Sequence, residues 1–162
     1  MEWKGLMFKN DARPKAKFVM WLHLHGGMRT NDRLIQWGME VNPECTFCQL
    51  QNETRENLFV LCHYTKALWN RVIQWLARTY TATYNWEQYV QWAVQNNKGK
   101  SQDGTIFKLV FAEVVNAIWL ERNARVFEKR RRYWEALARE VAFVSCVRAS
   151  AGIRTKMQHL QF

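Results

Sequence analysis

The chain has 162 residues, of which 48% are apolar, and its formal net charge is +10. This length and apolar content support one sizeable core, so disorder is not expected to dominate. No apolar stretch approaches the roughly 18 residues of a membrane span, and the N-terminus lacks a signal-peptide core, so we expect an intracellular protein of the nucleus or cytoplasm with no membrane partner. Glycine and proline number only seven and two, which favours a mostly α-helical fold with little or no sheet.

Helices are predicted along the first 97 residues from apolar residues at helical spacing. The segments are residues 14–24, 30–38, 54–62, 65–76 and 85–94. Thr30, Thr65 and Asn85 are each expected to cap the helix that follows, because their side-chain oxygens can accept a hydrogen bond from a free backbone N–H group. Gln88 extends the third of these caps into a capping box.

The chain divides into four predicted parts. Residues 1–97 form a helical lobe containing the cysteine motif of residues 45–62, and the polar run at 98–104 is a linker. Residues 105–151 form a C-terminal pair of helices, and residues 152–162 a frayed tail. The expected architecture is a small, zinc-knuckle-like helical lobe packed on a helical bundle.

Three of the four cysteines lie close together in the sequence. Cys45-Thr-Phe-Cys48 places two thiols on one tight turn, and Cys62 follows fourteen residues later. Thiolates at this spacing are typical ligands of a tetrahedral Zn²⁺ ion. The alternative is that all three are ordinary buried thiols, since cysteine is among the most buried residue types. Cys146 matches no ligand pattern and is expected in the core.

The residues around these cysteines resemble the zinc-binding domain that follows the reverse transcriptase in plant LINE-type retrotransposons. In that family Cys-x2-Cys is followed by Glu-Thr, by His-Leu-Phe and by a last Cys. The corresponding segments here are Glu53-Thr54, Asn57-Leu58-Phe59 and Cys62, and further matches are Trp21-Leu22, His25-Gly26, Asn31-Asp32-Arg33-Leu34, Trp37-Gly38, Trp69 and Ile118–Arg125. The resemblance spans about residues 3–127. It implies zinc binding and engagement of element RNA or DNA, here in a copy standing alone without the polymerase.

One family ligand is replaced. Asn57 occupies the position of the zinc-binding histidine, and a neutral amide is a poorer Zn²⁺ ligand than imidazole or thiolate. His63 directly follows Cys62, but neighbouring helical residues point about 100° apart, so both could reach one ion only if the helix ended there. His23 and His25 could approach only through tertiary folding. The candidate metal ligands are therefore Cys45, Cys48, Cys62 and His63, with Zn²⁺ as a possible cofactor.

The positive charge is concentrated in the second half of the chain. Residues 1–62 contain 8 Lys and Arg against 7 Asp and Glu, whereas residues 63–162 contain 16 against 7. Such an excess favours RNA or DNA as a partner. The candidate contacts are Arg122, Arg125, Lys129, Arg130, Arg131 and Arg132. The alternatives are a solvated face and, for Arg122, pairing with carboxylates inside the fold.

The nine tryptophans are mostly expected in the core, with Trp3, Trp86 and Trp92 as the exposed members.

Catalysis is not expected. Reverse transcription and RNase H cleavage need clustered carboxylates that hold two metal ions, but the only aspartates are Asp11, Asp32 and Asp103. No phosphate-binding Gly-rich loop or hydrolase motif is present. Two functions stay open: a non-catalytic retrotransposon-derived module that binds nucleic acid, and a repurposed protein-interaction module with a regulatory or inhibitory role.

Overall fold

A computed structural model describes residues 2–80, 83–98 and 101–162. The described residues are mostly helical and contain no β-strand, only an isolated antiparallel bridge between Glu44 and Asn52. This confirms the expected fold class. The elements are α1 (Lys4–Met7), α2 (Pro14–Leu24), α3 (Asn31–Gln36), a π-helical turn η1 (Asn57–Leu61), α4 (His63–Trp75), α5 (Trp86–Asn96), α6 (Gln102–Asn123), a second π-helical turn η2 (Ala124–Glu128), α7 (Trp134–Arg148) and α8 (Ala151–Gln158). No described helix is both long and apolar enough to cross a membrane.

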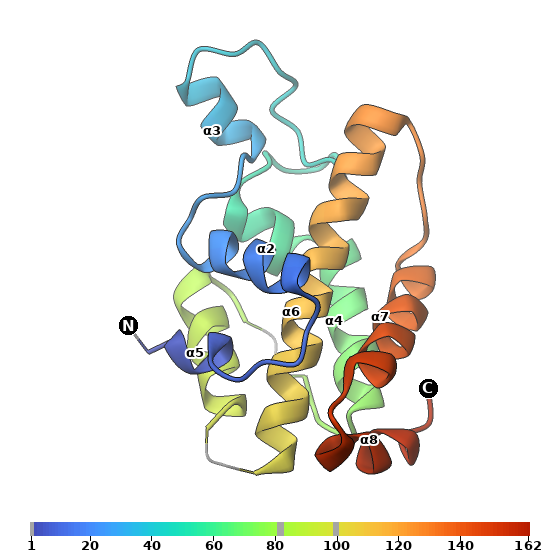
Figure 1. Cartoon of the computed structure of the whole chain (residues 1–162). Coiled ribbons are helices and arrows are strands. Elements are labelled where there is room, and N and C mark those ends of the chain that lie inside the picture. The colour runs from blue at the N-terminus through green and yellow to red at the C-terminus, as the bar shows by residue number, and fades with distance from the viewer. Residues whose placement is uncertain (1, 81–82, 99–100) are drawn as a thin grey trace.

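Helix α6 runs through the middle of the molecule, with α2, α5, α7 and α8 packed around it (Figure 1). The Ser101 side chain accepts a hydrogen bond from Gly104 N–H and caps the start of the helix. Apolar residues on nearly every face of α6 are buried, including Val110, Val114 and Ile118. A helix that is apolar all round is buried in a core, so α6 is the central element.

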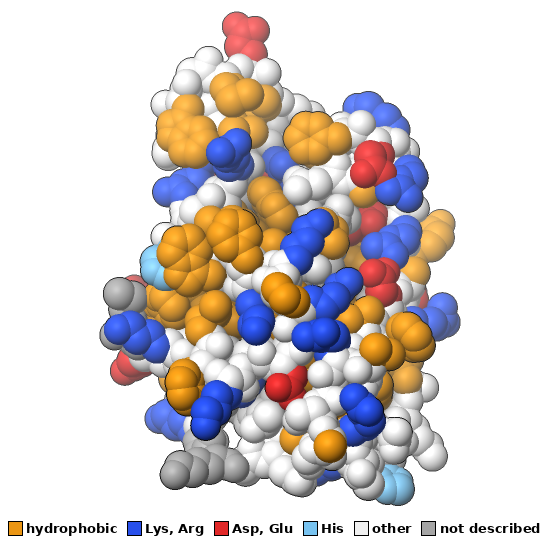
Figure 2. Space-filling model, in the orientation of Figure 1, with side chains coloured by type: hydrophobic (Ala, Val, Ile, Leu, Met, Phe, Trp, Pro, Cys, Tyr) orange, Lys and Arg blue, Asp and Glu red, His pale blue; other side chains and the backbone are white. Residues whose placement is uncertain are grey.

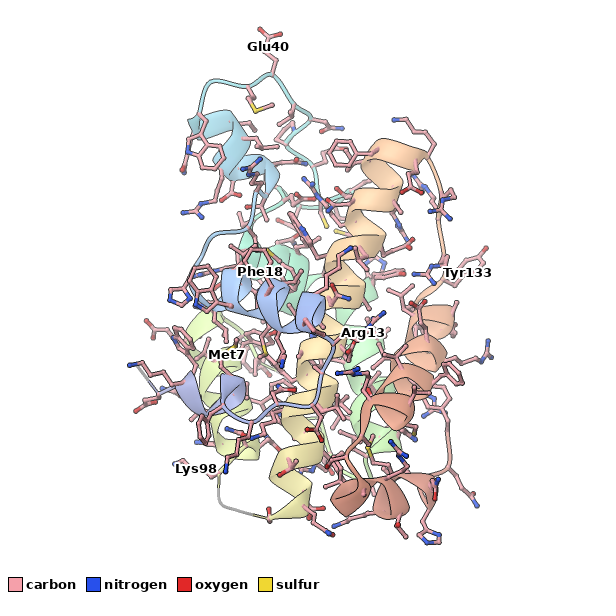
Figure 3. The ribbon with its side chains drawn as sticks, viewed as in Figure 1. Met7, Arg13, Phe18, Glu40, Lys98 and Tyr133 are labelled. Carbon is pink, nitrogen blue, oxygen red and sulfur yellow. The ribbon has the colours of Figure 1, made fainter. Side chains whose placement is uncertain are left out.

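Helix α2 crosses α6 and fixes the N-terminal segment to it (Figure 1). Pro14 stands in the first turn, where its missing N–H leaves no hydrogen bond unmade. Gly26 follows the helix with a φ of +72°, a left-handed conformation that favours glycine. Beside α6, Arg13 forms an ion pair of 2.8 Å with the buried carboxylate of Glu113 (Figure 3).

The core is dominated by aromatic rings. Trp69, Tyr89 and Phe111 are fully buried and lie with ring centroids 5.4 to 6.1 Å apart, the usual spacing of packed aromatic pairs. Most tryptophans are in the core or packed against it, since Trp69, Trp75 and Trp92 are buried and Trp119 and Trp134 are partly buried. The predicted exposure of Trp3, Trp86 and Trp92 is wrong, because Trp92 is buried and the other two are partly buried against the core. The exposed tryptophans are Trp21 and Trp37, on α2 and after α3.

Two predicted caps are wrong. Thr30 stands at the N-cap of α3, but its hydroxyl donates to the Asp32 carboxylate and makes no cap to the backbone. Helix α4 begins at His63, so Thr65 lies inside it, where its hydroxyl donates to the Leu58 carbonyl oxygen. The Asn85 cap is confirmed, because the Asn85 side chain accepts from Gln88 N–H at 2.8 Å.

The C-terminal segment is helical, which corrects the predicted frayed tail. Ile153 and Met157, one helical turn apart, are both buried, so α8 is held by burial of one apolar face. Helix α6 begins at Gln102, within the predicted linker, of which residues 99–100 lie outside the described residues. The predicted helical pair corresponds to α6 and α7, which pack against each other.

Candidate metal centre and basic cleft

The segment between α3 and η1 folds into a knuckle loop, residues 43–53, closed by backbone hydrogen bonds. Cys45 N–H donates to the Gln51 carbonyl at 2.7 Å, and Gln49 N–H donates to the Cys45 carbonyl at 3.0 Å. Gln49 adopts a φ of +57°, which turns the chain back within the loop. These bonds fix Cys45 and Cys48 on one tight turn, as the spacing of the two cysteines predicts.

Three thiols meet at this loop. The Sγ atoms of Cys45, Cys48 and Cys62 all lie within 4.8 Å of one another, and Cys45 and Cys62 are buried. A tetrahedral zinc ion with bonds of about 2.3 Å holds its sulfur ligands about 3.8 Å apart, so the three sulfurs need little movement to share one ion. Among the described residues, no other group of three or more His, Cys, Asp or Glu side chains is arranged to hold a metal.

Hydrogen bonding polarises the buried pair of thiols. The hydrogen bond between the Cys62 and Cys45 side chains lowers the pKa of Cys45 to about 6 and raises that of Cys62, whose thiol is the donor. Burial opposes ionisation at both residues. One thiolate is thus already favoured, and thiolate is the form that binds Zn²⁺. The chemistry of the donors fits zinc.

Cys62 stands at a break between two helical segments. The π-helical turn η1 closes with Cys62 N–H donating to the Asn57 carbonyl at 2.8 Å, and Cys62 itself has an extended backbone. Helix α4 then begins at His63. Cys62 and His63 could reach one ion only if a helix ended between them, and the structure has such a break at Cys62. His63 is nevertheless exposed and is not among the clustered ligands, although it lines the same cleft as Cys48 and Cys62.

Asn57 stands where the family resemblance places a zinc-binding histidine. Its side chain is 5% exposed, and its Oδ1 has no hydrogen-bond partner in the described part of the chain. Asn57 lines a cleft of about 650 Å³ together with Cys48, Cys62 and His63. Nearly all buried polar atoms in folded proteins are paired, so this oxygen is an unsatisfied acceptor beside the cleft that Cys48 and Cys62 also line.

Residues 1–69 match the protein family described as zinc-binding in reverse transcriptase. The match supports a reverse-transcriptase zinc-binding domain in this part of the chain, and residues 1–69 are called the zinc-binding domain below. The match includes all three clustered cysteines and Asn57, but it ends before α6, to which the sequence resemblance extended. No match was found among curated proteins or among solved structures.

The buried carboxylate of Glu53 adds a polar link between the knuckle loop and α6 to the packing of α2 on α6. Its Oε1 accepts hydrogen bonds from the Arg122 guanidinium at 2.8 and 3.1 Å and from Asn31 N–H at 3.1 Å. Its Oε2 accepts from the hydroxyl and N–H of Thr46. One side chain therefore joins the knuckle loop, the start of α3 and the end of α6. Sequence reasoning placed Glu53 only as a motif residue and missed this role.

Arg122 and Arg125, predicted to contact nucleic acid, are inside the structure. Arg122 is 3% exposed and paired with Glu53, which is the alternative that the sequence left open. The Arg125 guanidinium lies 4.9 and 4.7 Å from the ring centroids of Phe47 and Tyr64 and pairs with Glu121. Both residues support the fold, and both also line the α3 cleft described below.

The basic run after η2 is partly neutralised. Arg130 pairs with Glu128, and Arg132 pairs with Glu121 and Glu140. Lys129 and Arg131 are exposed and form no ion pair with any described residue. Lys129 adopts a φ of +55° and ends the π-helical turn, so the chain reverses there towards α7. Of the predicted run, Lys129 and Arg131 are therefore the residues whose charges are free for an anionic partner.

These two cations border a cleft between the zinc-binding domain and η2. The α3 cleft, about 400 Å³, is lined on one side by Leu34 and Met39 and on the other by Phe127, Lys129 and Arg131. Cys45 and Thr46 also line it, so the knuckle loop separates the α3 cleft from the cleft beside Asn57. The figures show hydrophobic side chains over α3 with Lys and Arg side chains nearby, and Glu40 at the tip beyond α3 (Figures 2 and 3).

Proposed function

We propose that this chain is a non-catalytic, retrotransposon-derived module that binds single-stranded nucleic acid, RNA in the first place, in its α3 cleft. The observation that carries the proposal is that Lys129 and Arg131 lie opposite apolar side chains of the zinc-binding domain. Both cations are exposed, and neither forms an ion pair with a described carboxylate. Unpaired cations attract phosphates, and this attraction does not depend on base sequence.

Exposed aromatic rings beside the cleft suit a single strand. Phe127, on the cleft wall, is 75% exposed, and Trp37, which is 60% exposed, lies in the chain between Leu34 and Met39, two residues that line the cleft. Unpaired bases stack on such rings, and each stacked base contributes about 1–3 kcal/mol to binding. A duplex does not offer its base faces in this way. The combination of rings and unpaired cations supports a single-stranded ligand.

Zinc has a structural role in this proposal. Cys45, Cys48 and Cys62 would hold the ion, whose binding would cross-link the knuckle loop to the start of α4. Because Cys45 and Thr46 also line the α3 cleft, a metal ion that holds the knuckle loop in place would also hold this part of the cleft wall in place. Met39 and Leu34 are then held opposite Lys129 and Arg131, the cations that follow η2.

The absence of catalysis is part of the same proposal. The described residues contain no carboxylate cluster of the kind that holds two catalytic metal ions. Glu53, Glu113 and Glu121 are all engaged in ion pairs with arginines. We therefore expect no primer extension and no RNA cleavage by this chain in the presence of Mg²⁺ or Mn²⁺.

Binding of fluorescein-labelled single-stranded RNA, followed by anisotropy, tests the proposal. Trp37→Ala and Phe127→Ala should each weaken binding by about 5- to 150-fold, the equivalent of one stacked base. The matched control is Phe143→Ala, since Phe143 is also about 70% exposed but lies on α7, outside the cleft lining. Equal affinities for all three variants and the native protein would contradict the assigned surface and favour a protein partner for these exposed side chains.

A further inference from the structure

The metal position is open to solvent on one side. Cys48 is half-buried, and it lines the cleft of about 650 Å³ together with Asn57, Cys62 and His63. Cys45 does not line this cleft and closes the opposite side. An ion held by the three sulfurs would therefore be shielded towards Cys45 and reachable from the side of Asn57.

Asn57 lines the same cleft as Cys48 and Cys62 but is a weak donor. Its backbone is fixed at both ends, by N–H donation to Thr54 Oγ1 at 2.9 Å and by the carbonyl that accepts from Cys62 N–H. Its buried Oδ1 is left without a partner among the described residues. A neutral amide oxygen binds a borderline-soft ion such as Zn²⁺ less well than imidazole or thiolate does. A better donor that can enter the cleft should displace it.

The charge of the site selects the kind of donor. Three thiolates around a divalent ion carry a net charge of −1, and the carboxylate of Glu44 also lines the cleft. An anionic fourth donor would add a second negative charge next to this carboxylate in a partly buried place, which is unfavourable. The side chains of Leu50 and Leu61 lie on the cleft walls and can flank a flat apolar ring. A neutral imidazole satisfies both conditions.

We propose that the fourth coordination position of this centre is exchangeable and accepts an imidazole from outside the chain, the chemistry of a histidine side chain on another protein molecule. The zinc-binding domain would thus use an external ligand where its family uses a histidine of its own. This inference rests on the metal-binding half of the proposed function and is independent of nucleic-acid binding. Failure of one can therefore be told from failure of the other.

Cobalt spectroscopy on the full chain tests the proposal. Co²⁺ replaces Zn²⁺ in thiolate sites, and its visible absorption reports the ligand set directly. Free imidazole should shift the spectrum of the native Co²⁺ protein saturably, and the Asn57→His protein should show the imidazole-saturated spectrum without any addition. Asn57→His should also tighten metal binding by roughly 10-fold or more. Asn57→Ala, which cannot supply a donor, should bind imidazole at least as tightly as the native protein.

The controls decide between external and internal donors. His63→Ala should leave the spectrum and the imidazole response unchanged, because His63 is not among the clustered ligands. A native spectrum that ignores imidazole and changes on His63→Ala would show that His63 fills the position and would overturn the proposal. A response to an added thiol but not to imidazole would overturn it as well, as would failure of the native protein to bind Co²⁺ at all.

Discussion

The guanidinium of Arg122, near the end of α6, lies 2.8 Å from the carboxylate of Glu53 in the zinc-binding domain, and both side chains are buried. Sixty-nine residues separate the two in sequence. The pair connects the segment that matches the reverse-transcriptase family to a helix outside that segment. Together with the packing of α2 on α6 and the Arg13–Glu113 ion pair, it joins residues 1–69 to the C-terminal helices.

Arg122→Met should destabilise the protein by about 3–5 kcal/mol, because it leaves the Glu53 carboxylate buried without its counter-charge. Thermal or denaturant unfolding measures the change. Arg130→Met is the matched control, since Arg130 is exposed and its pair with Glu128 lies on the surface, and it should shift stability by no more than about 0.5 kcal/mol. Similar losses in the two variants would refute a structural role for the buried pair.

The arginines of the loop before α7 should differ in their effects. Arg130, Arg131 and Arg132 are all exposed, but their contacts differ. Arg132 in fact contacts the buried Glu121 carboxylate through its backbone N–H at 2.7 Å and through its side chain. Arg132→Ala should therefore lower the melting temperature more than Arg130→Ala or Arg131→Ala. Three indistinguishable melting curves would show that the backbone contact alone is sufficient.

Zinc content should depend on residue 57. The native protein, with three clustered sulfurs and a weak fourth donor, should lose zinc to a moderate chelator, whereas Asn57→His should retain it and melt at a higher temperature. Elemental analysis after dialysis gives the stoichiometry, and Cys62→Ser sets the background. One zinc per native chain that resists the chelator, with no gain from Asn57→His, would mean that the chain completes the site in another way.

Acid should destabilise the fold through His23. This ring is fully buried, bonded through Nε2 to the Tyr89 hydroxyl at 2.9 Å, and burial lowers its pKa well below the usual 6.5. Below about pH 6.5 the unfolded chain takes up a proton that the folded chain does not, so stability is lost as the pH falls, by up to about 1.4 kcal/mol per pH unit.

His23→Gln should remove this contribution from a series of unfolding curves between pH 7 and pH 5. The control His25→Gln should leave it in place, because His25 is exposed and stacks on Trp21. A pH dependence that is unchanged by His23→Gln would assign it to other groups.

Local features of this protein were readable from its sequence, but pairings between distant segments were not. The helices, the Asn85 cap and the Cys45–Cys48 turn follow from neighbouring residues, and the structure bears them out. The roles of Arg122 and Arg125 depend on partners in the knuckle loop, and a basic residue alone does not reveal whether it meets a phosphate or a buried carboxylate.

The exposed aromatic residues were also misassigned, for a related reason. Trp92 was expected on the surface, but α6 supplies Phe107, whose ring centroid lies 5.4 Å from that of Trp92. Trp37 follows a six-residue helix that packs little of its surface, so its ring stays exposed. Burial of a large ring is decided by which element covers it, and this is a property of the tertiary fold.

The salt dependence of single-stranded RNA binding tests the central claim most directly. For the native zinc-loaded protein, the logarithm of the association constant should fall linearly with the logarithm of salt concentration. Replacing Lys129 and Arg131 together with Gln should flatten the slope by about 1.4 units, two phosphate contacts at about 0.7 each, while Lys15→Gln with Lys17→Gln on α2 should not. Weak binding with a flat slope in the native protein, or a slope untouched by the Lys129 and Arg131 changes, would contradict a nucleic-acid site in the α3 cleft.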